Sequence, residues 1–141
     1  MMTRRIVVAV AVLFLALSAF AQKDLKSRVD AATGADKAKL ALDYTEQATK
    51  DTDKAFKDGK DEDGAASLKE IAQYAKIAAD ASIESNKHQK DIEINLRKVV
   101  NRLVDIKNAR PYDQQDAVQQ VIDSVDNARN SLLEAMFKKS H

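Results

Sequence analysis

The chain has 141 residues, of which 45% are hydrophobic, and its 23 Lys and Arg nearly balance its 22 Asp and Glu. This length suits one domain, and the balanced charge excludes a simple polyanion-binding protein, which would be strongly basic. The absence of cysteine excludes disulfides, thiolate metal sites, iron–sulfur clusters and c-type haem attachment. With 3 glycines and 1 proline, the composition favours helices over a turn-rich sheet protein.

The first 21 residues have the three-part layout of a secretory signal peptide. Arg4 and Arg5 precede an apolar run over residues 6–17, and Ala19 and Ala21 occupy the −3 and −1 positions of an Ala-x-Ala cleavage site. The alternative, an uncleaved anchor, is disfavoured because spanning a membrane takes about 20 apolar residues. We therefore expect an exported chain, periplasmic or secreted, with no permanent membrane anchor after cleavage.

The remaining chain divides into a flexible N-terminal segment, residues 22–34, and a helical domain, residues 35–141. Residues 33–36 match a capping box, in which Thr33 accepts a hydrogen bond from the first turn of a helix and Asp36 occupies its third position. We therefore expect the first helix of the domain to begin here.

A polar turn over residues 57–64 separates the first two helices. Gly59 is placed to end a helix in the left-handed conformation, and either Asp61 or Asp63 is placed to cap the next helix.

The third break lies at Pro111, because proline disfavours helix at the residue before it. Asp113 is placed to cap the helix that follows. The helix before this break is rich in arginine and lysine, and the helix after it begins with aspartates. An antiparallel pairing of the two is expected to bring Arg110 near Asp113 and Arg102 near Asp123.

The middle of the chain carries a seam with a spacing of three and four residues: Leu68, Ile71, Ala75, Ala78, Ser82, Ser85, Gln89, Ile92, Leu96, Val99, Leu103 and Ile106. A long 3.5-residue repeat is typical of helices wound around one another. Its centre is polar, since residues 84–91 contain no large apolar side chain. Two alternatives are open, a single long helix or two helices joined near residues 86–88, where Asn86 tolerates a left-handed C-cap and Asp91 suits a helix start.

With the break, the sequence predicts an all-α, antiparallel bundle of three to four helices, arranged as two αα-hairpins over roughly residues 35–85 and 90–138. The seam supplies the candidate interaction residues. Its polar waist is a candidate groove or register device, because polar seam positions can specify pairing, and a plain inter-helix loop is the alternative. The apolar seam is expected to support folding and assembly. These candidates are Ser82, Ser85, Gln89, Ile92, Leu96, Val99 and Leu103.

No catalytic or metal site can be assembled from the sequence. The chain after residue 21 has two histidines, His88 and His141, and it lacks a nucleophile–base pair, a Gly-rich phosphate loop and a His-Glu-x-x-His motif. Glu84 and His88 are four residues apart, whereas di-iron bundles place Glu-x-x-His on each of two helices. Soluble b-type cytochromes are similar in length and helix content, but they use a methionine near the start, and here the one methionine after residue 21 is Met136. We expect no enzyme activity, no metal and no cofactor.

The basic stretch over residues 97–110 has no interleaved aromatic residues for stacking on bases, so we expect no nucleic-acid partner. Residues 84–88, 94–97, 102–103 and 131–134 make the chain similar to small exported all-helical proteins of bacteria. That resemblance implies an exported helical protein and no established activity. The resulting hypothesis is a non-catalytic exported bundle that acts through protein–protein contact or self-association in the cell envelope. The alternative is a periplasmic bundle that carries haem, a metal or a small apolar molecule.

Overall fold

The computed structural model describes residues 23–139, and within this range the chain is helical and contains no strand. The all-α prediction is therefore confirmed. The predicted signal peptide, residues 1–21, lies outside the described residues. The four long helices are α2 (Gly34–Lys57), α3 (Asp61–Ser85), α4 (Gln89–Asn108) and α5 (Gln115–Lys139).

A fifth helix over residues 23–31 precedes α2, and a short 3-10 helix, η1 (Tyr112–Gln114), precedes α5. The segment expected to be flexible is thus helical over residues 23–31, and the side chain of Val29 is fully buried. Counting this segment, five helices pack together in the described range, one more than the upper end of the prediction.

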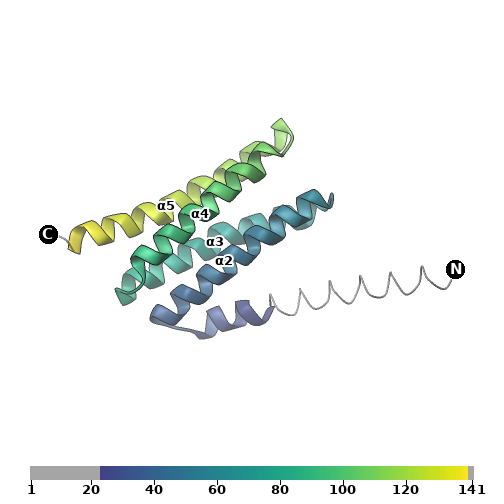
Figure 1. Ribbon diagram of the computed structural model, residues 1–141. Helices are drawn as coiled ribbons and strands as arrows, with labels where there is room; N and C mark the ends of the chain where they lie inside the picture. The colour runs from purple at the N-terminus through teal and green to yellow at the C-terminus, as the bar shows by residue number, and fades with distance from the viewer. Residues whose placement is uncertain (1–22, 140–141) are drawn as a thin grey trace.

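The long helices form two antiparallel hairpins, α2 with α3 and α4 with α5 (Figure 1). The hairpins join mainly through α3 against α5 and less extensively through α2 against α4. The chain also reverses direction between α3 and α4, so α3 runs parallel to α5 and α2 runs parallel to α4 (Figure 1). The α3–α4 turn leads from the first hairpin into the second.

The chain breaks between α3 and α4, so the single long helix is excluded. Asn86 and His88 have φ angles of 60° and 63°, the left-handed conformation that asparagine tolerates better than most residues. The backbone N–H of Lys87 donates to the carbonyl of Ser82 at 3.2 Å, and the Ser82 hydroxyl donates to the carbonyl of Lys87 at 2.5 Å. The backbone bond is the closure of a Schellman motif.

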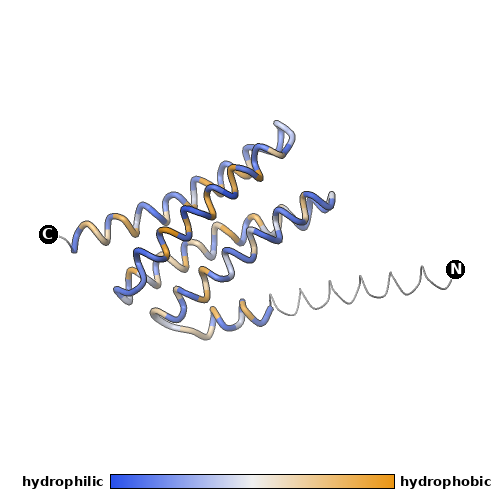
Figure 2. Tube along the Cα trace, in the orientation of Figure 1, coloured by the Kyte–Doolittle hydropathy of each residue, from blue (hydrophilic) through white to orange (hydrophobic). Residues whose placement is uncertain are grey.

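Both halves of the seam line the same core. All twelve seam residues are buried except Ser85, which is half-buried. Figure 2 shows that apolar positions recur along the helices between polar ones. Because the chain reverses at the break, both halves of the continuous repeat are buried within one chain.

The buried face of α2 contains three threonines, Thr45, Thr49 and Thr52. Each hydroxyl donates to the backbone carbonyl four residues earlier, at distances between 2.7 and 2.8 Å. Because these hydroxyls are satisfied within the helix, they can face the core without needing partners from another helix.

The predicted ends of the helices are partly confirmed. Gly59 has a φ of 75° after α2, and α4 ends before Pro111, as expected. The predicted side-chain caps are wrong. Thr33 makes no capping bond, α3 follows Lys60 with Asp61 already inside its first turn, and Asp113 lies within η1. Acidic residues inside a first turn still favour the helix through its dipole, without a capping hydrogen bond.

Arg102 and Arg110 form ion pairs with the first hairpin, so the predicted charge pairs are wrong. Arg110 Nη2 lies 3.2 Å from Asp61 Oδ1, and Arg102 Nη2 lies 3.9 Å from Asp53 Oδ2. The prediction considered only partners within the second hairpin, whereas Arg102 lies beside Asp53 of α2 and Arg110 lies beside Asp61 at the start of α3. These side chains therefore tie the two hairpins together.

Phe56 fills the space between the two hairpin turns. The Arg110 guanidinium carbon lies 4.1 Å from the centroid of its ring. On another side of Phe56 is Gly64, where an added Cβ would lie 2.4 Å from ring atom Cε1 and 2.5 Å from Cδ1. Any side chain at position 64 would clash with the Phe56 ring, so α3 requires a glycine there.

We predict that Gly64→Ala destabilises the protein by about 1–3 kcal/mol, the usual cost of overpacking. In a Phe56→Ala background the same change should instead stabilise it by about 0.5–1 kcal/mol, because alanine is the better helix former. Urea denaturation followed by circular dichroism measures both. Destabilisation of similar size in the two backgrounds would contradict the proposed clash.

Candidate functional site

The structure places the apolar candidate residues in the interior of the chain. The residues Ile92, Leu96, Val99 and Leu103 expose between 0% and 4% of their surface. Their seam therefore packs against helices of the same chain, and a surface that meets a partner has to be formed by other residues.

The polar waist forms part of the α3–α4 turn. Ser82 is fully buried and bonded to the carbonyl of Lys87, and the Ser85 hydroxyl donates to the carbonyl of Ser82 at 3.3 Å. Gln89, at the start of α4, is 7% exposed, and its Oε1 accepts a hydrogen bond from Lys139 Nζ at 2.8 Å. The serines thus close a turn, and Gln89 joins the start of α4 to the end of α5.

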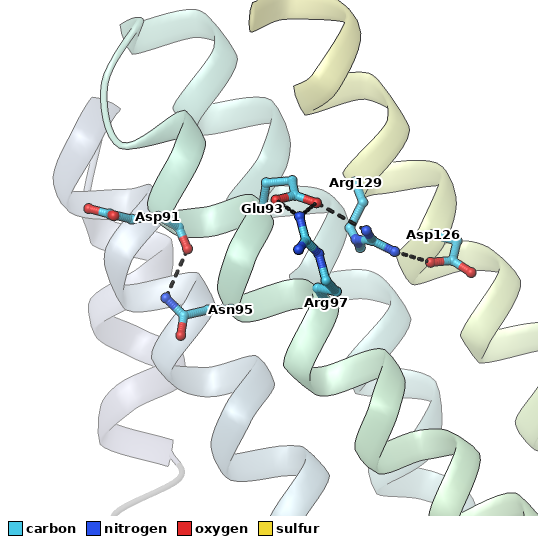
Figure 3. A network of polar contacts seen from close by, with 6 residues as sticks. All are labelled: Asp91, Glu93, Asn95, Arg97, Asp126 and Arg129. Atoms are coloured by element: carbon cyan, nitrogen blue, oxygen red, sulfur yellow. Dashed lines mark hydrogen bonds and ion pairs between the residues drawn. The ribbon is translucent and has the colours of Figure 1, made fainter.

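One turn beyond Gln89, a buried carboxylate joins the same two helices (Figure 3). The Glu93 side chain is 4% exposed. Arg97 Nη2 donates to its two oxygens at 2.9 and 2.8 Å, and Arg129 Nη2 donates to Oε1 at 3.0 Å. Arg129 Nη1 in turn donates to Asp126 Oδ1 at 2.7 Å. The two carboxylates and two guanidiniums balance in charge.

Glu93 remains ionised because of these partners. Burial by itself would raise the pKa of its carboxyl group, but the hydrogen bonds and positive charges of Arg97 and Arg129 outweigh burial and lower this pKa below its usual value. Both carboxylate oxygens are occupied by guanidinium groups, which do not give up protons at physiological pH. The arrangement suits holding α4 against α5 and does not suit acid–base catalysis.

A second polar cluster fastens the helix over residues 23–31 to the first hairpin. Tyr44 and Tyr74 stack with ring centroids 4.1 Å apart, and the Tyr44 hydroxyl donates to Glu70 Oε2. Lys26 Nζ lies 3.5 Å from Glu70 Oε1 and 6.0 Å from the centroid of Tyr74. Burial and the neighbouring Glu70 raise the pKa of Tyr44, so its hydroxyl stays protonated and acts as a donor.

An open groove of about 430 Å³ runs between α3 and α5. Lys76 and Asp80 form an ion pair of 2.7 Å in its lining. The other lining residues are small or carry amides and hydroxyls: Ala72, Gln73, Ser124, Asn127, Ala128 and Ser131. No aromatic or large apolar side chain is among these lining residues, whereas small-molecule pockets are lined predominantly by hydrophobic and aromatic side chains. In the described range no three His, Asp or Glu residues gather where they could hold a metal ion.

The large apolar side chains that the described residues expose all belong to the second hairpin. Val104 on α4 is 39% exposed, Tyr112 in η1 is 92% exposed, and Phe137 near the end of α5 is 67% exposed. Aromatic side chains are enriched where proteins meet. The second hairpin is therefore the candidate contact surface.

The charge network around Glu93 was not predicted, although half of it is visible in the sequence. Glu93 and Arg97 have the i,i+4 spacing of a helical ion pair, and Glu93 directly follows the seam residue Ile92. Arg129 and Lys139, by contrast, lie 36 and 50 residues from their partners. No local pattern identifies such contacts.

We predict that Glu93→Gln lowers the free energy of unfolding at pH 7 by about 1–3 kcal/mol, because it weakens bonds to two guanidiniums. The folded-state pKa of Glu93 lies below the usual value of 4.5, so the carboxylate stabilises the protein fully above that pH and progressively less as the pH falls through the lowered pKa. The gap between the variant and the wild type should therefore shrink in acid.

Urea denaturation at neutral pH and in acid measures this gap, and the exposed Glu84→Gln is the matched control, with an expected effect below about 0.5 kcal/mol. An equal gap at both pH values would show that the charge of Glu93 does not stabilise the fold.

No helix within residues 23–139 is long and apolar enough to cross a membrane. Comparison of the chain with protein-family models, with curated proteins and with solved structures finds no match.

Proposed function

We propose that this protein is a non-catalytic helical bundle, exported to the cell envelope by a leader that is cleaved after Ala21, and that it acts through protein–protein contact. The observation that carries the proposal is that the large apolar side chains exposed by the described residues, Val104, Tyr112 and Phe137, all belong to the second hairpin. Two of them are aromatic, and aromatic side chains are enriched where proteins meet.

The exposed aromatic residues are carried by well-anchored parts of the chain. Tyr112 follows Pro111, next to Arg110, whose side chain is 10% exposed and bonded to Asp61 and Gln114. Phe137 follows Met136, which packs against the core. A residue whose backbone is already held in place loses less entropy when it binds, which favours its use as an anchor.

The hydrogen bonds of two groups that could act as an acid or a base, Glu93 and Tyr44, support a non-catalytic role. Glu93 is held by two arginines, and the hydroxyl of Tyr44 is bonded to Glu70. A catalytic acid or base needs reach to a substrate proton, whereas these groups are occupied by partners within the chain.

The test is photo-crosslinking in an exporting host, with a photoreactive residue placed at Tyr112 or Phe137 and, as the control, at the exposed Lys50 on α2. We expect discrete protein adducts from the second hairpin and none from Lys50. Tyr112→Ser and Phe137→Ser should each weaken that contact about tenfold or more, as loss of an anchor residue does. Adducts of equal yield at all three positions, or at none, would refute the proposal.

A further inference from the structure

The face of the second hairpin turned away from the first hairpin carries a second regular stripe, which we name the outer face. On α4 it consists of positions spaced by four and three residues that avoid the core: Lys90, Ile94, Arg97, Asn101 and Val104. On α5 it consists of Asp123, Asp126, Asn130, Leu133 and Phe137. All ten side chains are exposed or half-buried. A repeat of this spacing is the one that lets helices pair along their length.

The two halves of the outer face align level by level. Lys107 bonds to Gln119, and Gln89 bonds to Lys139, so residues of α4 and α5 whose numbers sum to about 227 lie at the same height. Lys90 is therefore level with Phe137, and Ile94 is level with Leu133. One apolar residue of each helix, Ile94 and Leu133, thus lies at the same height, and Phe137 lies at the height of the long Lys90 side chain.

The charges of the outer face are divided between its helices. The α4 half carries Lys90 and Arg97, and the α5 half carries Asp123 and Asp126. Arg97 and Asp126 keep 55% and 40% of their side-chain surface exposed, although each has a partner within the chain. One face thus presents a basic stripe beside an acidic stripe, which makes it complementary to a copy of itself.

We infer that the outer face is the interface of a two-fold symmetric dimer, in which α4 of one copy lies antiparallel along α5 of a second copy. This inference rests on the proposed protein-contact function and names its partner. A two-fold axis parallel to the helices sets Ile94 against Leu133 of the other copy, Lys90 against the Phe137 ring, and Arg97 within one helical turn of Asp126. The other face-to-face two-fold lays α4 on α4 and brings like charges together, which is unfavourable. Closed dimers of this isologous kind are the commonest protein assemblies.

The first experiment measures the mass of the protein, purified from an exporting host, by light scattering after size separation at increasing concentration. We expect twice the monomer mass. The double variant Val104→Ser with Phe137→Ser should be monomeric, with an unchanged circular dichroism spectrum because both side chains are exposed, while the control Lys50→Ser stays dimeric. A wild-type monomer at every concentration, or a double variant that stays dimeric, would overturn the inference.

The second experiment uses the absence of cysteine in the chain. Lys90→Cys protein is mixed with Phe137→Cys protein under mild oxidation, and we expect a mixed disulfide dimer in clear excess over that of a control mixture of Lys50→Cys with Lys69→Cys, two exposed positions on the first hairpin. Equal yields from the two mixtures would overturn the proposed orientation.

The two proposals fail separately. A monomer that still forms adducts from Tyr112 with another envelope protein overturns the dimer and leaves the protein-contact function standing. A monomer that forms no adducts from Tyr112 or Phe137 overturns both.

Discussion

Asn86 and His88 hold φ angles of 60° and 63°, and the packing of the two hairpins depends on the turn that they make. The three- and four-residue spacing of the seam from Leu68 to Ile106 continues unbroken across this turn. If the turn were helical, α3 and α4 would form one long helix, and the seam would be a single exposed strip along it. The left-handed residues fold it back, and the Schellman bond from Lys87 to Ser82 closes the helix end. The apolar surface that would otherwise require another chain is buried within this one.

Once the seam is internal, polar contacts position the hairpins. Arg110 covers the Phe56 ring and reaches Asp61 at one end of the bundle. Toward the other end, Glu93 joins α4 to α5 through Arg97 and Arg129. Removing one partner of such a buried pair leaves an unpaired charge, which costs more than the pair itself contributes. The main effect of these contacts is therefore to fix how the helices lie against one another. They hold in place the second hairpin, which carries the exposed apolar residues.

The sequence was sufficient for features that depend on local backbone preference or on periodicity. The left-handed stop at Gly59, the end of a helix before Pro111 and the burial of the seam are of this kind. It was not sufficient for contacts that depend on how helices rotate against each other. Whether Arg110 meets Asp113 or Asp61 follows from how the end of the second hairpin lies against the start of α3. The glycine at position 64 is explained by the ring of Phe56, eight residues earlier in the chain. The aspartates near helix starts were interpreted as N-caps, but they lie inside a first turn. A negative charge is favourable there because of the helix dipole, without a capping hydrogen bond.

The distance between the start of α3 and the end of α4 tests the central claim most directly. Spin labels on Glu62→Cys and Asn108→Cys, diluted with unlabelled protein, report it by pulsed electron–electron resonance. Because Arg110 contacts Asp61, we predict a separation within about 30 Å, roughly three helix diameters. A continuous helix through Asn86 and His88 would instead place the labels roughly 70 Å apart, and that result would contradict the folded-back seam.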